Sequence, residues 1–404
     1  MNLRLVLTFL LLFCSGAAVA APSAIVVDAD NGKVILDNNA KQLQYPASLT
    51  KVMTLYITFH AIEEGLLDWE DEIYVSSYAS RQPKSKMYLK KGDTITVEEA
   101  VKAIIVRSAN DAAVVIAETI GGTEENFANI MNDFAKKLGM KDTTFSNASG
   151  LTDEGVKSSA LDIAKLSLCV MHHFPDYYPL FSTKSFNFRG KTYGTTNNLL
   201  KTYKGAEGLK TGYTNKAGYN LAFSAANDDA RIIAVAMGRT SVKDRDRTMK
   251  KLLDTAFKKI KSDKENENKQ TITVNIPKAE MDNYRKVKHY IRTSKAMAAA
   301  SEQDRRKMFL LNDEGGEWVM QVGAYFDEKQ ALQAAKNILA KLFDGLDTGV
   351  AKVEEAYNSK GRKVYKAQIA NLSKYNAYEA CVNYKKCLIV RPSISKNDKL
   401  ALRD

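Results

Sequence analysis

The chain has 404 residues, of which 45% are hydrophobic and 26% charged, a composition that excludes a wholly disordered protein. The length predicts two or three domains. A formal net charge of +12 points to an anionic partner, but no compact arginine-rich motif accompanies it, so we do not expect that partner to be nucleic acid.

The first twenty residues have the pattern of an export signal. Arg4 is followed by a short apolar core, residues 5–13, and then by small residues that end at Ala20. A basic residue, an apolar core and a small-residue cleavage site define a secretory signal peptide. The apolar core is too short to span a bilayer. We therefore expect residues 1–20 to be removed and the exported protein to have no integral membrane segment.

A β-hairpin is predicted directly after the signal. Two β-rich segments, 24–27 and 33–36, flank the turn Asp30-Asn31-Gly32. Asn-Gly between apolar runs is a strong signal for a hairpin turn.

A buried helix follows the hairpin. Pro46 suits a first helical turn because its missing N–H is not needed there, and Gly65 is typical of the residue that ends a helix. Residues 52–62 between them are apolar on nearly every face, which is typical of a helix inside a large domain. Ser48 and Lys51 lie one turn apart at the start of this helix, on the same face.

This serine and lysine have a chemical use as a pair. A serine hydroxyl becomes a nucleophile when a nearby base accepts its proton, and a lysine whose pKa burial has lowered can be that base. The alternative is a polar first-turn serine beside a surface lysine. The same spacing recurs at Ser393 and Lys396, in a tail without such a helix, so the pattern alone is weak.

Five further helices and a second hairpin are predicted in the next two hundred residues. Thr96 and Glu99 form a capping box, and a break at 107–110 separates two of the helices. The predicted helices cover 97–106, 111–120, 123–139, 159–172 and 242–260, and the strands of the hairpin cover 219–226 and 231–238. Hairpins at both ends with helices between them predict an α+β domain over 21–260, with one antiparallel sheet under a helical cluster.

The remainder of the chain differs from the first domain in its charge and hydrophobic pattern. Residues 261–313 are charged without periodicity and are predicted to be a linker. Residues 314–393 contain a weak internal repeat of strand and helix, which predicts a small β-α-β-β-α-β domain, and 394–404 form a tail.

Three short motifs occur in order in the first domain. They are Ser48-x-x-Lys51, Ser108-Ala109-Asn110 and Lys210-Thr211-Gly212. Each is common alone, but the combination is the set used by penicillin-recognising serine enzymes. On the strings around these motifs, together with Ala217-Gly218-Tyr219-Asn220-Leu221, residues 21 to about 260 resemble the D-alanyl-D-alanine carboxypeptidases, the low-molecular-mass penicillin-binding proteins.

The resemblance implies a β-lactamase-like fold and a role for each motif residue. Ser48 would form an acyl-enzyme with the penultimate D-alanine of a peptidoglycan stem peptide, and Lys51 would accept its proton. The rest of the implied site comprises Ser108 and Asn110 on the opposite wall, Lys210, Thr211, Gly212 and Arg245 around the terminal carboxylate, and the backbone N–H groups of Ser48 and Tyr213 at the oxyanion. Relatives often have histidine where this chain has Tyr213.

The C-terminal domain resembles a SPOR domain, a module that binds peptidoglycan glycan strands stripped of their peptides. The likeness lies in the string from Trp318 to Tyr325 and implies Gln321 and Lys366 as glycan contacts, although Gln321 is equally well explained as a solvated strand residue. By strand alternation, Trp318, Met320 and Val322 share one face and are predicted to be core.

The resemblance implies peptidoglycan as the partner, β-lactam antibiotics as covalent inhibitors, and the periplasm, including the septum, as the location. No cofactor is expected. His60 is interpreted as a core histidine, and the pair His172-His173 lacks metal-ligand spacing, so no metal is expected either. Cys381 and Cys387 could form a disulfide, whereas Cys169 lies in an apolar helical stretch.

Several functions remain open on the sequence alone. A carboxypeptidase, a D,D-endopeptidase and a weak transpeptidase share one acyl-enzyme. A class A β-lactamase adds a glutamate in an E-x-x-L-N loop, and no such string lies between Ser108 and Lys210. A non-catalytic peptidoglycan-binding scaffold would have no need to keep Ser48, Lys51 and Lys210 together.

Overall fold

The computed structural model describes residues 21–265, 273–277, 281, 284–299, 318–342, 350–358, 362–372 and 388–390. The chain forms two compact units, one made of residues up to 75 together with 79–298, and the other in the C-terminal part. The predicted signal peptide, the pair Cys381 and Cys387, and the predicted tail lie outside the described residues.

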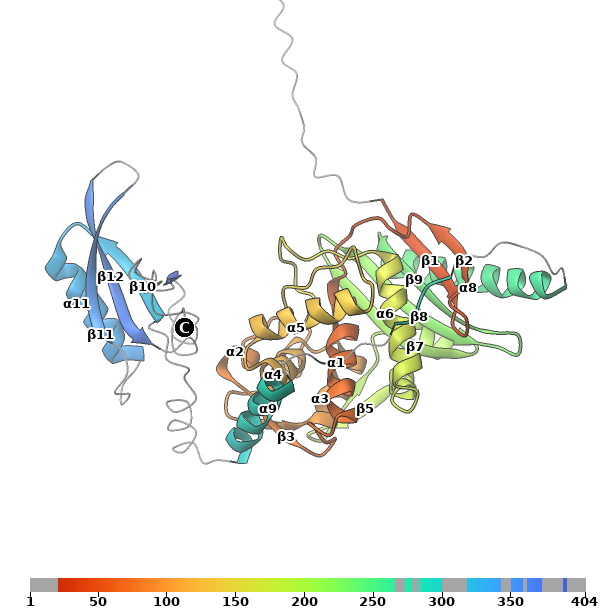
Figure 1. Ribbon diagram of the computed structural model, residues 1–404, viewed down its shortest axis with the longest axis horizontal. Coiled ribbons are helices and arrows are strands. Elements are labelled where there is room, and N and C mark those ends of the chain that lie inside the picture. Colours follow the sequence, from red (N-terminus) through yellow and green to blue (C-terminus); the bar gives the residue numbers. More distant parts are fainter. Residues whose placement is uncertain are drawn as a thin grey trace, which may run out of the picture. The chain divides into compact units, whose positions relative to one another are not determined.

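The first unit contains a five-stranded antiparallel sheet (Figure 1). Its strands, in the order β2-β1-β9-β8-β7, are β2 (Val34–Asn38), β1 (Ser23–Asp28), β9 (Arg231–Arg239), β8 (Gly218–Ala226) and β7 (Ala206–Thr214). Both predicted hairpins are confirmed, and pairing between β1 and β9 joins them into the single predicted sheet. The edge strand β7, which carries the Lys210 motif, was not predicted as a strand.

The predicted central helix is confirmed. A 3₁₀ turn, η1 (Ala47–Thr50), leads into α1 (Lys51–Glu63), and every residue from Lys51 to Ala61 is buried. Gly65, with a φ of +62°, ends the helix as predicted, in a conformation that favours glycine. Because the helix is buried, its first turn has a fixed position inside the unit.

The remaining helices surround α1 and the sheet (Figure 1). Thr96 and Glu99 form the predicted capping box, and Thr123 and Ser159 each accept a hydrogen bond from a backbone N–H as caps of the next helices. The helices are α2 (Ser77–Ser80), α3 (Val97–Arg107), α4 (Asn110–Gly121), α5 (Glu124–Lys137), α6 (Ala160–His173), η2 (Tyr178–Ser182), α7 (Leu199–Thr202) and α8 (Val242–Glu265). Two small two-stranded antiparallel sheets complete the unit, β3 (Glu72–Tyr74) with β4 (Thr94–Thr96) and β5 (Ser185–Phe188) with β6 (Lys191–Gly194).

The sheet carries helices on both faces. On one face, Met249 and Leu253 of α8 pack into a cluster with Leu221 and Phe223 of β8. Helix α6 contacts β1, β8 and β9. Because β8 and β9 are covered in this way, both read as nearly continuous apolar runs, and both are buried over most of their length.

Part of the predicted linker belongs to the first unit. Helix α8 continues to Glu265, and a further helix, α9 (Tyr284–Ala299), lies where 261–313 was expected to be a charged connection. Ser294 Oγ lies 3.0 Å from Thr119 Oγ1 of α4, and Lys295 forms an ion pair with Asp71. The linker prediction missed this helix because the charged, aperiodic sequence of 261–313 carries no local signal for its contacts with Thr119 and Asp71.

The second unit is a four-stranded antiparallel sheet with a helix. The sheet order is β11-β12-β10-β13, from β10 (Trp318–Tyr325), β11 (Val350–Tyr357), β12 (Lys363–Leu372) and β13 (Leu388–Val390), and α11 (Glu328–Leu342) packs against it. Met320 and Val322 are buried against α11, as the alternation predicted. The second helix of the predicted β-α-β-β-α-β order, expected at 375–384, lies outside the described residues.

No helix among the described residues is long and apolar enough to cross a membrane.

Candidate active site

Ser48 and Lys51 meet at the junction of η1 and α1. Lys51 Nζ lies within hydrogen-bond distance of Ser48 Oγ, at 3.1 Å, so the predicted pairing is present in the structure. Ser48 is partly exposed, whereas the Lys51 side chain is completely buried. A reactive hydroxyl at the surface and a base beneath it are the arrangement that serine activation needs.

Two further oxygens hold the Lys51 amine. Lys51 Nζ lies 2.7 Å from Asn110 Oδ1 and 2.6 Å from the carbonyl oxygen of Ser149. Both oxygens can only accept hydrogen bonds. A neutral amine has two N–H groups for these two acceptors, and its lone pair is then left toward Ser48. The geometry therefore suits a lysine that accepts the serine proton.

The environment favours the neutral amine. Burial, together with the nearby positive charge of Lys210, holds the pKa of Lys51 well below its usual range. Asp111 and Glu124 act in the opposite direction.

A buried carboxylate fixes the chain next to Asn110. Asp111, at the start of α4, accepts hydrogen bonds from the backbone N–H groups of Met87 and Leu89. Next to it, the Asn110 side chain donates to the carbonyl of Pro83. The segment around 83–89 is thereby fixed beside the motif Ser108-Ala109-Asn110.

Ser108 and Lys210 form a second serine–lysine pair. Lys210 Nζ donates to Ser108 Oγ at 2.8 Å and to the carbonyl of Thr211 at 2.8 Å. Ser108 has a φ of +57° at the end of α3, which turns the chain between α3 and α4 and places the hydroxyl toward β7. Burial, followed by the positive charge of Arg245, lowers the pKa of Lys210 to about 7.

The edge strand β7 runs directly beside η1. A Cβ atom added to Gly212 would lie 3.1 Å from both Ser48 N and Pro46 O, so only a residue without a side chain fits without displacement. Thr211 Oγ1 lies 3.0 Å from Thr196 Oγ1. The Gly212 contact places β7 close to the Ser48 N–H.

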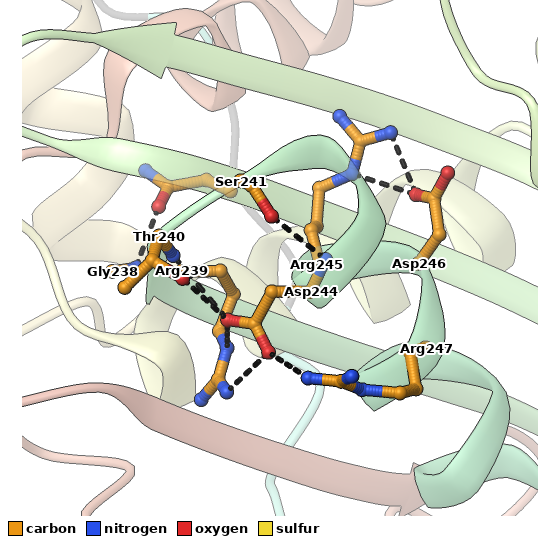
Figure 2. A network of polar contacts seen from close by, with 9 residues as sticks. Gly238, Arg239, Thr240, Ser241, Asp244, Arg245, Asp246 and Arg247 are labelled. Carbon is orange, nitrogen blue, oxygen red and sulfur yellow. Dashed lines mark hydrogen bonds and ion pairs between the residues drawn. The ribbon is translucent and has the colours of Figure 1, made fainter.

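Arg245 lies in the first turn of α8, within a cluster of charged residues (Figure 2). Its guanidinium donates through Nε and Nη2 to one oxygen of Asp246, at 2.8 and 2.7 Å. These bonds use two of the five N–H donors of an arginine. Since Arg245 also lowers the pKa of Lys210, the structure brings it into the electrostatic range of the site.

The other two arginines of this cluster form ion pairs with Asp244. Figure 2 shows Arg239 and Arg247 on the Asp244 carboxylate. The hydrogen bonds from Arg239 hold the pKa of Asp244 at about 2. Asp244 therefore keeps its charge, and it anchors the start of α8 to the end of β9.

The loop 147–150 was missed as part of the site. Asn147 Oδ1 accepts hydrogen bonds from Ser149 N and Gly150 N, and this turn aims the Ser149 carbonyl at Lys51. Gly150 has a φ of +76°, and an added Cβ would lie 1.8 Å from the carbonyl oxygen of Ala47. The sequence signal was Asn147-x-Ser149-Gly150, an Asx-turn pattern without an evident catalytic meaning.

Residues 13–241 match the sequence profile of the family described as D-alanyl-D-alanine carboxypeptidase. The match covers more than half of the chain. The chain belongs to the D-alanyl-D-alanine carboxypeptidase family.

Individual proteins are similar to this chain in sequence or in fold. D-alanyl-D-alanine carboxypeptidase DacF of Bacillus subtilis is 38% identical over 252 residues, which are 60% of this chain and 64% of that protein. Penicillin-binding protein 5 of Haemophilus influenzae has a TM-score of 0.57 at 35% identity, over 59% of this chain and 71% of that chain. Penicillin-binding protein D2 of Listeria monocytogenes, solved in an ampicillin-bound form, has a TM-score of 0.52 at 31% identity, over 58% and 96%. The chain spans less than two thirds of the length of the DacF protein.

The first unit thus has the transpeptidase-like α+β fold of the carboxypeptidase family, as predicted. It brings together the Ser48 alcohol beside a buried amine and a second serine–lysine pair, Ser108 with Lys210. This arrangement could carry out acyl transfer to Ser48, with proton movement on both sides of the reacting carbonyl.

The other residues singled out in the sequence lie away from this chemistry. His60 packs against the rings of Phe134 and Phe174 in the core, and burial raises the pKa of the Cys169 thiol to about 12. Among the described residues, no group of three potential metal ligands occurs.

The two predicted glycan contacts lie in the second unit, on the same face of its sheet. Gln321 and Lys366 alternate with residues that are buried against α11, so both point to the opposite face. Lys366 lies 3.5 Å from Glu354, and Gln321 pairs in register with Gln368. The position is compatible with a contact role and equally with a solvated one.

Proposed function

We propose that this protein is a serine-type D-alanyl-D-alanine carboxypeptidase that removes the terminal D-alanine from peptidoglycan stem peptides through an acyl-enzyme. The observation that carries the proposal is the Lys51 amine, which is buried, held by two acceptors and directed at Ser48 Oγ. A scaffold protein would have no use for a buried amine whose pKa is lowered in this way.

In the proposed acylation step, one proton leaves the attacking hydroxyl and one proton reaches the leaving amine. Ser48 Oγ attacks the carbonyl carbon of the penultimate D-alanine, and Lys51 accepts the hydroxyl proton. The backbone N–H groups of Ser48 and Tyr213 stabilise the oxyanion. The C–N bond then breaks, and Ser108, which Lys210 contacts, relays the proton held by Lys51 to the leaving amine, so that Lys51 is neutral again. A water molecule later hydrolyses the ester and regenerates the Ser48 hydroxyl.

The terminal carboxylate of the substrate is proposed to bind at the positive end of the cleft. Lys210, Thr211 and Arg245 surround this position, and charge-assisted hydrogen bonds to a carboxylate are among the stronger polar contacts in proteins. The two cations also explain the direction in which the peptide binds, because they attract its negatively charged C-terminal end.

β-Lactam antibiotics are proposed as covalent inhibitors that acylate Ser48. A relative with 31% identity has been solved in an ampicillin-bound form. The β-lactam carbonyl and its carboxylate would take the places of the scissile carbonyl and the terminal carboxylate. A β-lactamase or a D,D-endopeptidase remains the alternative within the same acyl-enzyme chemistry.

The C-terminal unit is proposed to be a SPOR-like module that directs the enzyme to glycan strands, with Gln321 and Lys366 among the contacts. Support comes from the antiparallel sheet with one packed helix and from the sequence likeness of β10. The proposed location is the periplasm, including the septum, because the first twenty residues have the composition of an export signal.

The experiment is a comparison of wild type and Ser48→Ala on a defined pentapeptide muropeptide, with products identified by mass spectrometry. We expect loss of one D-alanine with wild type and no product with the variant. Covalent labelling by penicillin should disappear in the same variant while its thermal unfolding is unchanged. Cleavage of a cross-linked dimer in preference to the pentapeptide would favour the endopeptidase, and rapid release of hydrolysed penicillin would favour the β-lactamase.

A further inference from the structure

A buried carboxylate at the start of α5 lies beside the loop that holds Lys51. Glu124 is the first residue of this helix, directly after the capping residue Thr123, and it is buried. Its Oε1 accepts a hydrogen bond from the backbone N–H of Ala148 at 2.9 Å, and this contact is buried as well. A hydrogen bond to a carboxylate is stronger than one between neutral groups. Helix α5 therefore grips the loop 147–150 through its backbone.

The residue that Glu124 holds is fixed from its other side by α1. The carbonyl of Ala148 accepts a hydrogen bond from Thr54 Oγ1 at 2.7 Å, and Thr54 lies one turn after Lys51 in α1. The next residue along the loop is Ser149, whose carbonyl lies 2.6 Å from Lys51 Nζ. Since Ala148 is tied to two helices, the carbonyl that follows it has little freedom to move.

The hydrogen bonds inside the loop have a different effect. Asn147 Oδ1 accepts from the N–H groups of Ser149 and Gly150, and these bonds shape the turn. They do not tie the turn to the rest of the unit, so a turn held by them alone could still shift as one body. The contact with Glu124 joins the turn to a long helix.

We propose that Glu124 is a positioning residue for the Lys51 base, because its carboxylate anchors the loop 147–150 and keeps the Ser149 carbonyl on the Lys51 amine. The inference rests on the proposed function, since it takes Lys51 as the base that activates Ser48. The Ser149 carbonyl and Asn110 Oδ1 take the two N–H groups of the neutral amine, which leaves its lone pair for the Ser48 hydroxyl. A loop that shifted would release one N–H group and let the amine turn away.

The charge of this carboxylate also acts on Lys51. Lys210 of β7, Asp111 of α4 and Glu124 of α5 are the charged groups that act on this amine. Burial and Lys210 lower the pKa of Lys51, whereas Glu124 and Asp111 act to raise it. Glutamine at position 124 would keep a side-chain oxygen that accepts from Ala148 N but would carry no charge. The anchoring and the electrostatic effect can therefore be separated by substitution.

The test measures the second-order rate constant for covalent labelling by a fluorescent penicillin as a function of pH, for wild type, Glu124→Ala and Glu124→Gln. We expect Glu124→Ala to label roughly tenfold or more slowly at every pH, because the Ala148 N–H loses its partner and the loop its anchor. Glu124→Gln should restore the highest rate to within about threefold of wild type. In this variant the fall of the rate toward acid should move to lower pH, because protonated Lys51 loses a favourable negative charge.

The matched control is Glu125→Gln, which removes the same charge from the exposed next position of α5 and should keep the rate and the pH profile of wild type. Thermal unfolding of each variant checks the fold, and if Glu124→Ala does not fold, the pH profile of Glu124→Gln decides alone. Labelling of folded Glu124→Ala at the wild-type rate, or coincident pH profiles of wild type and Glu124→Gln, would overturn this inference and leave the carboxypeptidase proposal standing. Absence of labelling in wild type would instead overturn the proposed function, and the inference with it.

Discussion

Replacement of Lys51 by arginine separates the charge of this side chain from its ability to accept a proton. Lysine can lose its proton when burial lowers its pKa, and the pKa of Lys51 is lowered by burial and by Lys210. Arginine stays protonated in proteins and has no lone pair to offer. The variant therefore keeps a cation in the site and removes the proposed base.

The magnitude follows from the hydrogen bonds of the amine. Asn110 Oδ1 and the Ser149 carbonyl take the two N–H groups of neutral lysine, so the lone pair directed at Ser48 is the single feature that accepts its proton. Loss of general-base help slows a reaction about 10²- to 10⁴-fold, or roughly 3–5 kcal/mol in the barrier. We expect Lys51→Arg to lower the rate of acylation at least about a hundredfold.

The assay is the second-order rate constant for covalent labelling by a fluorescent penicillin, read from gels over time. The control is Lys102→Arg, at a surface lysine that pairs with Glu98 one helical turn away, and it should label at the wild-type rate. Thermal unfolding of both variants excludes misfolding as the cause. Acylation of Lys51→Arg within about threefold of wild type would refute the assignment of Lys51 as the base.

Three further outcomes are expected. Because the pKa of Lys210 is about 7, its positive charge is present below that pH and lost above it, so kcat/KM should fall as the pH rises through about 7. Lys210→Arg should abolish this alkaline decrease, and a decrease that persists in the variant would show that another group titrates. Gly150→Ala should reduce both the Tm and penicillin labelling, because its Cβ would meet the Ala47 carbonyl at 1.8 Å. The control Gly139→Ala, with a φ of +68° and nothing within 4 Å, should cost only about 1–2 kcal/mol of stability and leave labelling intact; equal effects of the two changes would contradict the steric argument. Deletion of residues 314–404 should leave hydrolysis of a small soluble peptide nearly unchanged but weaken binding to wall sacculi, most of all to sacculi rich in denuded glycan. If the truncated protein remained folded and lost hydrolysis of the soluble peptide, a targeting role would be contradicted.

Local sequence signals predicted most elements of the first unit. The capping box at Thr96 and the glycine after α1 are decided by hydrogen bonds and backbone conformation within a few residues, so they can be read without tertiary context. The strand β7 and the helix α9 were missed, as were the short elements β3 to β6, α2, η2 and α7. Strand β7 is punctuated by glycines because it passes close to η1 and η2, and this closeness is invisible in the sequence.

The sequence by itself determined which residues could carry the chemistry. Ser48, Lys51, Ser108, Asn110 and Lys210 were all named from three short motifs, because a chemical role restricts the residue type at each position. The geometry shows that four of them form two hydrogen-bonded serine–lysine pairs, while Asn110 holds Lys51.

Only the tertiary structure decided what surrounds these residues. The Ser149 carbonyl that holds Lys51 comes from 98 residues along the chain, and a backbone oxygen leaves no trace in residue identity. The lowered pKa of Lys210 likewise depends on burial and on Arg245, which a separate helix brings near. Sequence motifs identify the groups that react. Desolvation and long-range contacts arise only when distant segments pack together, and they decide whether the lysine amines are neutral or charged.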